Sequence, residues 1–350
     1  MKIQMMKWIE DIFFEFRSIT GTGIENTLSY FEKINPEFKR LKFKSGKKIF
    51  DWKIPYEWEI KEAYFKHISG KKFADFKKNN LHIIGYSTPI SKTMSKKELL
   101  KNIFTSKKRK NAIPYVTSYY KKKWGFCLSE NQKKKLPNGK YKVYINSKFI
   151  KGHLDLSHAV LKGKSNKEIF FSSYCCHPSM ANNELSGPVL LNAILKKIKE
   201  KYKKTNYSYR FLLGPETIGS IAYLSKFKKT LKSNVICGFV LSCVGDNRAY
   251  SLISSRKENT LADLSLKTVL KNKKNFNQYS FLERGSDERQ FCSPGIDLPF
   301  AGFSRSKYGK YPEYHTSDDN LKIISEENLQ NSLKVFMEII ESFELGVYPK

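Results

Sequence analysis

The chain has 350 residues and a net charge of +31, with 40% hydrophobic and 14% aromatic residues. This length suffices for one large domain with an insertion or for two modest domains. No apolar run approaches the roughly 20 residues that a membrane-spanning helix needs. The first residues, MKIQMMKWIEDIFFEFRS, lack the continuous apolar core of a signal peptide. We therefore expect a cytoplasmic protein without a membrane span.

The positive charge raises the question of nucleic-acid binding. Only nine of the 64 basic residues are arginine, the side chain best suited to phosphate and base contacts. The lysine runs, such as KSGKK and KKRK, are scattered over the chain and do not mark one face. A general lysine bias therefore explains the charge best, and we expect only non-specific attraction to nucleic acid at low salt. The oligomeric state stays open.

The first part of the chain contains two segments of different character. Residues 1–50 favour mainly helical structure. Residues 56–147 alternate apolar and polar positions and contain the turn signals Ser69-Gly70 and Asn138-Gly139, which are typical of hairpins. We predict an inserted β-rich domain over residues 56–147, with aromatic segments such as SYY in its own core.

From residue 148 onward strand and helix patterns alternate, as in EIFFSSYCC followed by PVLLNAILKKIKEKY. Apolar strands of this kind predict a mostly parallel sheet between two helix layers, an α/β fold. We assign residues 1–55 and 148–350 to this domain. Ligands bind beyond the carboxyl ends of such strands. Several polar residues follow the predicted strands and are expected to converge there: His177, Glu216, Asp246 and the Gly285–Arg289 loop.

Two histidines in polar loops are the candidate metal ligands. His177 follows the strand EIFFSSY, and His315 lies in YHTSDD, where Asp318 or Asp319 is expected to bond the second ring nitrogen of His315. Histidines together with acidic or amide groups at strand ends are typical of zinc hydrolases. A hydrogen-bonded structural histidine is the alternative for each.

Further residues carry candidate roles around these histidines. Glu216 is the candidate general base, although a carboxylate there also stabilises a helix N-terminus. Asp287 and Asp246 are weaker candidate ligands. Arg289, with Glu288, is expected to contact an anionic group of the substrate. An ordinary charged turn is the alternative interpretation of GSDERQF.

Several blocks along nearly the whole chain resemble the zinc-dependent exopeptidase, or aminopeptidase-like, superfamily. They resemble in particular bacterial proteins described as polysaccharide biosynthesis proteins with an aminopeptidase-like domain, a family of largely unknown function. The resemblance implies a three-layer α/β/α core with an inserted β-rich domain. The blocks are RSITGTGIENTL, FDWKIPYEW, DFKKNNLHIIGYS, IPYVTSYYKKKWGFCLS, HPSMANNELSGP, PETIGSIAYLS, GSDERQFCSPGIDLP and YPEYHTSDDNL.

The resemblance also implies roles for individual positions. His177 and His315 match the first and last histidine ligands of the di-zinc aminopeptidases, and Glu216 matches their catalytic base. The metal-bridging aspartate is replaced by Asn183, which is at best a weak ligand. The two remaining acidic positions hold Thr217 and Ser242. Three anionic ligands of a di-zinc centre are therefore missing.

The loss of these acids argues against two metal ions. Two divalent cations about 3.5–4 Å apart repel by roughly 20 kcal/mol at an effective dielectric constant near 20. We therefore expect one zinc ion and a hydrolase acting on an amide bond of a small or sugar-linked substrate, in surface polysaccharide biosynthesis. The alternative is a metal-free binding or partner protein in glycan assembly that keeps the fold of an enzyme.

Overall fold

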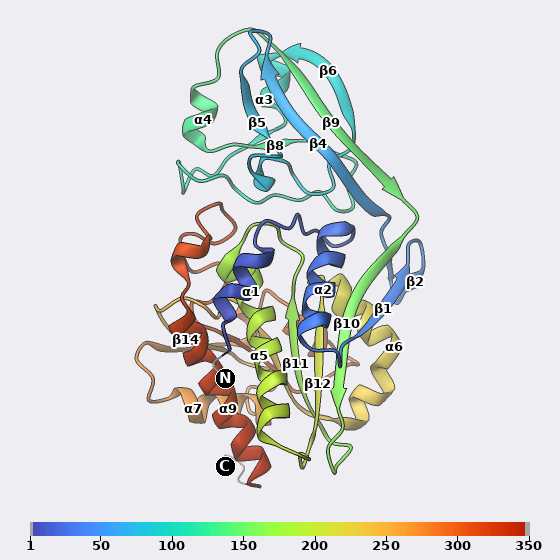
Figure 1. Ribbon diagram of the computed structural model, residues 1–350, viewed down its shortest axis with the longest axis vertical. Coiled ribbons are helices and arrows are strands. Elements are labelled where there is room, and N and C mark those ends of the chain that lie inside the picture. The colour runs from blue at the N-terminus through green and yellow to red at the C-terminus, as the bar shows by residue number, and fades with distance from the viewer. Residues whose placement is uncertain (1–2, 347–350) are drawn as a thin grey trace.

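An eight-stranded mixed sheet forms the centre of the computed structural model, which describes residues 3–346 (Figure 1). In spatial order its strands are β1 (Lys39–Lys44), β10 (His153–Leu161), β12 (Ser208–Gly214), β11 (Glu168–Tyr174), β13 (Val235–Leu241), β16 (Phe300–Ser304), β14 (Tyr250–Ile253) and β15 (Phe276–Tyr279). The four central strands, from β12 to β16, run parallel. The flanking strands β10 and β14 run antiparallel to them. The edge strand β15 is parallel to β14, so the sheet is mixed, with a parallel centre.

Helices cover both faces of this sheet. One layer contains α1 (Met5–Ile12), α2 (Thr22–Ile34), α5 (Ser186–Lys201), α7 (Leu261–Leu270) and α9 (Glu326–Glu344), and the other contains α6 (Ile218–Asn234) and α8 (Glu288–Phe291). All seven residues of β11 are buried. Ile169 and Phe171 pack into one core cluster and Phe170 into the other, because successive strand residues point to opposite faces. The predicted α/β fold is confirmed.

The prediction of mainly helical structure over residues 1–50 is wrong for its last part. Lys39–Lys44 forms the edge strand β1, paired antiparallel with β10. Arg40 there bonds Glu32 and Asp155, so long-range contacts favour the strand over the local pattern. Within residues 3–346 no helix is both long and apolar enough to cross a membrane.

A second, smaller sheet lies at one end of the long axis (Figure 1). Its strands, in spatial order, are β5 (Lys72–Asp75), β4 (Glu57–His67), β9 (Lys140–Ile150) and β6 (Ile90–Ser95). The Ser69-Gly70 turn joins β4 to β5, whereas Asn138-Gly139 precedes β9 and makes no hairpin. We propose that this sheet and its loops are the inserted domain, with β9 continuing three residues past the predicted boundary at 147.

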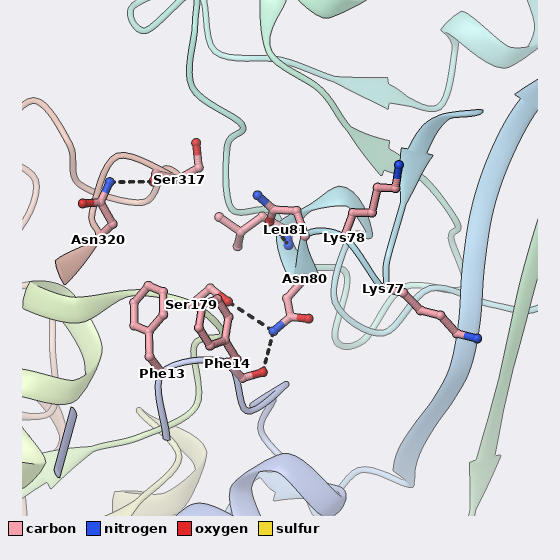
Figure 2. Close-up of a pocket in the computed structure, with 10 residues that line it drawn as sticks. Phe13, Phe14, Lys77, Lys78, Asn80, Leu81, Ser179, Ser317 and Asn320 are labelled. Atoms are coloured by element: carbon pink, nitrogen blue, oxygen red, sulfur yellow. Dashed lines mark hydrogen bonds between the residues drawn. The ribbon is translucent and has the colours of Figure 1, made fainter. Parts of the chain in front are cut away.

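Short elements complete the chain. They are β2 (Lys48–Ile49), β3 (Trp52–Lys53), α3 (Lys96–Leu100), β7 (Ile103–Phe104), β8 (Phe126–Cys127), α4 (Glu130–Lys134), the 3₁₀ turns η1 (Asn80–His82), η3 (Phe281–Glu283) and η4 (Leu321–Ile323), and the π-helical turn η2 (Ala181–Leu185). Figure 2 shows one junction between the small sheet and the core, where Asn80 Nδ2 donates hydrogen bonds to Phe14 O and Ser179 Oγ. The pocket of about 380 Å³ at this junction contains none of the predicted site residues.

Candidate functional site

The loops that follow β11 and β12 place two of the predicted site residues at one edge of the main sheet. His177 follows β11, and Glu216 lies two residues after the end of β12. These strands are parallel neighbours, so their carboxyl ends meet. Both residues line one pocket of about 270 Å³ together with His315. The other lining residues are Ile19, Tyr115, Thr117, Tyr119, Cys176 and Thr217.

The backbone at this edge adopts conformations that non-glycine residues rarely take. Thr217, Cys243 and His315 have φ angles of 64°, 55° and 56°. Left-handed conformations of this kind cost free energy and persist where the surrounding structure imposes them. Thr217 and His315 line the pocket, so two of its residues are held in such conformations.

Glu184 holds the ring of His177. Its Oε2 is 2.5 Å from Nδ1 of His177, and its Oε1 accepts the backbone N–H of the same residue at 2.7 Å. Arg17, which is fully buried, donates from Nε to the carbonyl of His177 at 3.0 Å. Burial lowers the pKa of His177, but the Glu184 carboxylate more than offsets this, and the net shift is upward. Because Glu184 engages Nδ1, Nε2 is the nitrogen directed into the pocket.

Sequence reasoning missed Glu184. It lies in the π-helical turn Ala181–Leu185 and is completely buried. Cys176, His177 and Glu184 bring three potential ligand atoms within 4.8 Å of one another. Nδ1 of His177 contacts both Cys176 Sγ, at 3.5 Å, and Glu184 Oε2, so the group is better described as a histidine with its supporting carboxylate than as a second metal centre.

The inserted segment fixes the loop that carries His315. The backbone N–H of Tyr115 donates to the carbonyl of His315 at 2.8 Å, and the N–H of Ser317 donates to the carbonyl of Ile113 at 2.8 Å. The ring of Tyr314 stacks on that of His315 with centroids 3.9 Å apart. The rings of His177 and His315 have centroids 5.1 Å apart. Two histidines from distant parts of the sequence are therefore adjacent.

The predicted partner of His315 is wrong. Asp319 accepts the backbone N–H groups of residues 181–183 and the hydroxyl of Tyr311, so it anchors the π-helical turn instead of the histidine ring. Asp318 pairs with Arg109. Nε2 of His315 is buried and, within residues 3–346, has no hydrogen-bond partner. Burial lowers the pKa of His315 well below its usual value, which keeps the imidazole neutral.

Glu216 lies beside His177 with its carboxylate at the pocket. Its Oε2 is 4.0 Å from Nε2 of His177, and Oε1 accepts a hydrogen bond from Ser286 Oγ at 2.7 Å. Burial raises the pKa of Glu216 to about 7. Asp287 lies close by, but its carboxylate accepts from Thr217 N and Ser220 Oγ at the start of α6. Asp287 therefore stabilises the start of α6, and it does not line the pocket as a metal ligand would.

Asn183 occupies the position of the expected bridging aspartate. Its side chain is buried, and Nδ2 donates to the hydroxyl of Tyr174 at 2.9 Å. Oδ1 is buried and has no hydrogen-bond partner among the residues that the structure describes. A buried amide oxygen without a partner is costly, so it is a candidate contact for a ligand or ion.

Like Asn183, the remaining predicted residues do not line the pocket. Asp246 accepts hydrogen bonds from Asn182 Nδ2, Ser306 and the Arg248 backbone. Glu288 is buried and accepts the hydroxyl of Tyr308. Arg289 is exposed and does not line the site. Asp246 and Glu288 serve the packing of loops, and a pocket contact for Arg289 is wrong because its side chain projects into solvent.

Comparison with known proteins places the chain in a family. The family described as "Domain of unknown function (DUF4910)" matches residues 6–345. A relative from Clostridium acetobutylicum, described as a "putative polysaccharide biosynthesis protein with aminopeptidase-like domain", is 42% identical over 341 residues, which are 96% of this chain and 76% of the relative.

Solved structures give the same picture of the fold. A "putative peptidase" from Clostridium acetobutylicum superposes with a TM-score of 0.93 at 40% identity, over 97% of this chain and 80% of the other. A zinc aminopeptidase from Bacillus subtilis superposes with a TM-score of 0.69 at 13% identity, over 97% and 94% of the two chains. The second likeness concerns the fold alone, which is aminopeptidase-like. The chain thus belongs to the DUF4910 family and has the α/β fold of the zinc aminopeptidases.

Proposed function

We propose that the protein is a metal-dependent hydrolase that holds one zinc ion and cleaves an amide bond of a small or sugar-linked substrate. The observation that carries this proposal is the common pocket of His177, His315 and Glu216. The aminopeptidase-like fold supports hydrolysis. The name of the 42% identical relative, which refers to polysaccharide biosynthesis, supports a sugar-linked substrate.

The donor atoms around the pocket fit one zinc ion. Nε2 of His315 and Oδ1 of Asn183 are buried without a hydrogen-bond partner in the described part of the chain, and Nδ1 of His177 is held by Glu184, which leaves Nε2 free. Neutral imidazoles with an oxygen donor are ordinary zinc ligands, and the Glu184–His177 pair is the usual support of such a histidine. His177 and His315, which line the pocket, would hold the ion. Asn183, next to Glu184 in the π-helical turn, is the weaker third ligand.

The same atoms do not fit two ions. Asn183 is neutral where a bridging carboxylate is expected from the resemblance, and Thr217 and Ser242 offer hydroxyl groups in place of acids. The mutual repulsion of two dications, roughly 20 kcal/mol at close range, would have no anionic bridge to offset it. A mononuclear centre is therefore proposed.

Zinc, when bound, supplies Lewis-acid activation of a water molecule and of the substrate carbonyl. Glu216 accepts the proton from the attacking water and returns it to the leaving amine. A C–O bond forms as the C–N bond breaks, giving a carboxylic acid and an amine. Ser286 holds Oε1 of Glu216, so Oε2, on the side of His177, is the atom that exchanges the proton.

Two tyrosines of the inserted segment complete the pocket. The hydroxyls of Tyr115 and Tyr119 lie 2.8 Å apart, so one of them donates to the other and one O–H remains available. Burial raises the pKa of both groups well above the usual value, so both stay protonated. We propose that the free O–H donates to the carbonyl oxygen of the substrate as negative charge develops on it.

The absence of three acidic ligands favours one alternative, a metal-free protein that uses the same pocket for binding. Thr217, for example, contributes its backbone N–H to Asp287 and offers no carboxylate. In this case His177 and Glu216 would contact a ligand without chemistry. The two functions differ in their dependence on zinc.

An amide-hydrolysis screen tests the proposed function. N-acylated amino sugars and aminoacyl anilides are incubated with the zinc-loaded protein, and the released amine is quantified. We expect zinc-dependent release from at least one amide, lost after chelation and restored by added zinc. Equal rates with zinc-loaded and chelated protein for every amide would contradict a metal-dependent hydrolase.

A further inference from the structure

A second pocket, built from the inserted segment, adjoins the candidate site. It has a volume of about 600 Å³, which is in the range of small-molecule sites. Its lining residues all lie between positions 55 and 149: Pro55, Tyr56, Tyr86, Thr88, Pro89, Tyr119, Tyr120, Lys121, Lys122 and Phe149. We call it the aromatic groove. Tyr119 also lines the pocket of His177 and Glu216, so the two spaces share a wall.

Exposed aromatic rings are concentrated in the aromatic groove. Tyr56, Tyr120 and Phe149 are 50%, 55% and 39% exposed, and all three line it. Most large apolar side chains are buried in the core of a protein. A group of exposed ones on the surface therefore marks an interaction site. These rings are therefore available to a ligand.

The floor of the groove is rigid. Tyr86 is buried, and its hydroxyl bonds Thr20 Oγ1 at 2.6 Å and the carbonyl of Tyr56 at 3.1 Å. Its ring stacks on Trp58 with centroids 5.5 Å apart. A fixed floor with exposed walls is pre-organised, which lowers the entropic cost of binding.

The inclination of the rings indicates the shape of the ligand. Tyr86 meets Tyr119 at 88° and Phe149 at 59°. A planar base needs parallel faces to stack between, whereas a puckered sugar ring presents C–H bonds in several directions. Tyrosine rings offer both an apolar face and a polar edge, which suits a saccharide with its C–H faces and hydroxyl groups.

The charge of the groove indicates an anionic group. Lys121 and Lys122 are exposed, and neither forms an ion pair within residues 3–346. Among the described residues, none that lines the groove is acidic. Two free ammonium groups beside aromatic rings suit a carboxylate or phosphate on the ligand.

We propose that the aromatic groove binds a saccharide unit that carries a negative charge. If the proposed function holds, the bound saccharide directs its amide past Tyr119 toward His177 and Glu216. Only this orientation of the ligand rests on the proposed function. The inserted segment then has two tasks, since it fixes the His315 loop and recognises the substrate. The charge belongs to a uronate carboxylate or to a sugar phosphate.

Fluorescence titration tests this proposal without requiring catalysis. Trp58 stacks on Tyr86, and Trp52 lies 5.3 Å from Tyr120, so tryptophan emission should report binding. The titration uses the Glu216→Gln variant in the presence of a chelator. The signal then reports ligand binding in the groove without contributions from metal binding or substrate turnover. The probes are a glucuronate–N-acetylglucosamine disaccharide, N-acetylglucosamine 1-phosphate, neutral chitobiose and uridine monophosphate.

We expect at least one acidic saccharide to bind about tenfold more tightly than chitobiose. Tyr120→Ala and the double variant Lys121→Gln/Lys122→Gln should each weaken it about tenfold. The matched controls Phe14→Ala, an exposed ring outside the groove, and Lys107→Gln/Lys108→Gln, another exposed lysine pair, should leave binding unchanged. The stronger of the two acidic probes identifies the charged group.

Three binding results with the unaltered groove would overturn the proposal: no binding of either acidic saccharide, equal binding of chitobiose, or tighter binding of uridine monophosphate. Binding that survives the groove variants would also overturn it. Because zinc is absent from the titration, a protein that binds the saccharide but hydrolyses no amide would contradict the proposed function alone.

Discussion

Replacing Glu216 with glutamine is expected to lower amide turnover by about two to four orders of magnitude, the usual contribution of a general base, while zinc content stays the same. Glutamine keeps the shape of the side chain, and its amide oxygen still accepts the hydrogen bond from Ser286 Oγ that Glu216 accepts now. It cannot take a proton from water. Amine release and metal content are measured on the same preparations.

The matched control is Glu283→Gln, which removes an exposed carboxylate outside the pocket. It should leave turnover and zinc content unchanged. If Glu216→Gln loses zinc together with activity, Glu216 is a metal ligand and the assignment of His177, His315 and Asn183 as the set is wrong. Unchanged turnover in Glu216→Gln would require another base.

Asn183→Asp is expected to make stability depend on zinc. The new carboxylate would replace a buried amide next to Glu184, and a buried charge without a cation costs several kcal/mol. In chelator we expect a loss of roughly 3 kcal/mol in the free energy of unfolding. Zinc should restore it, because a ligand that binds only the folded state stabilises that state. Urea unfolding in chelator measures the loss in the free energy of unfolding, and urea unfolding with added zinc measures its recovery.

The neighbouring residue provides the control. Asn182 is also buried, but both ends of its amide are engaged: Nδ2 donates to Asp246 at 2.9 Å, and Oδ1 accepts from the backbone N–H of Gly245 at 2.8 Å. Asn182→Asp should destabilise the fold, and zinc should not restore it. If zinc rescues both variants equally, or neither, then Asn183 does not face the metal position.

The sequence predicted those site residues that directly follow a strand. His177 and Glu216 follow apolar strands, and the carboxyl ends of parallel neighbours meet regardless of the rest of the fold. The alternation of strand and helix patterns predicted the main sheet, because that alternation is also visible in the local sequence. The pairing of β1 depends on contacts with Glu32 and Asp155, so a local pattern could not indicate it.

The walls of the site depend on contacts that a single sequence does not encode locally. Tyr119 was expected in the core of the inserted domain, yet it lines the pocket together with Tyr115. The nearby residues 113–115 pair with the His315 loop. Glu184 lies in an irregular turn with no recognisable periodicity. Asp319, expected to bond His315, instead accepts three backbone N–H groups of that turn.

Zinc stoichiometry tests the central claim most directly. The protein is purified without chelator or an affinity-tag metal, and its metal content is measured by mass spectrometry. His177→Ala is compared with His67→Ala, whose ring bonds Ser69 and Asn138 outside the site. We predict about one zinc per chain in the wild type and in His67→Ala, and none in His177→Ala. Two ions per chain would contradict the mononuclear site, and no zinc even with excess metal would contradict the hydrolase and leave a binding protein.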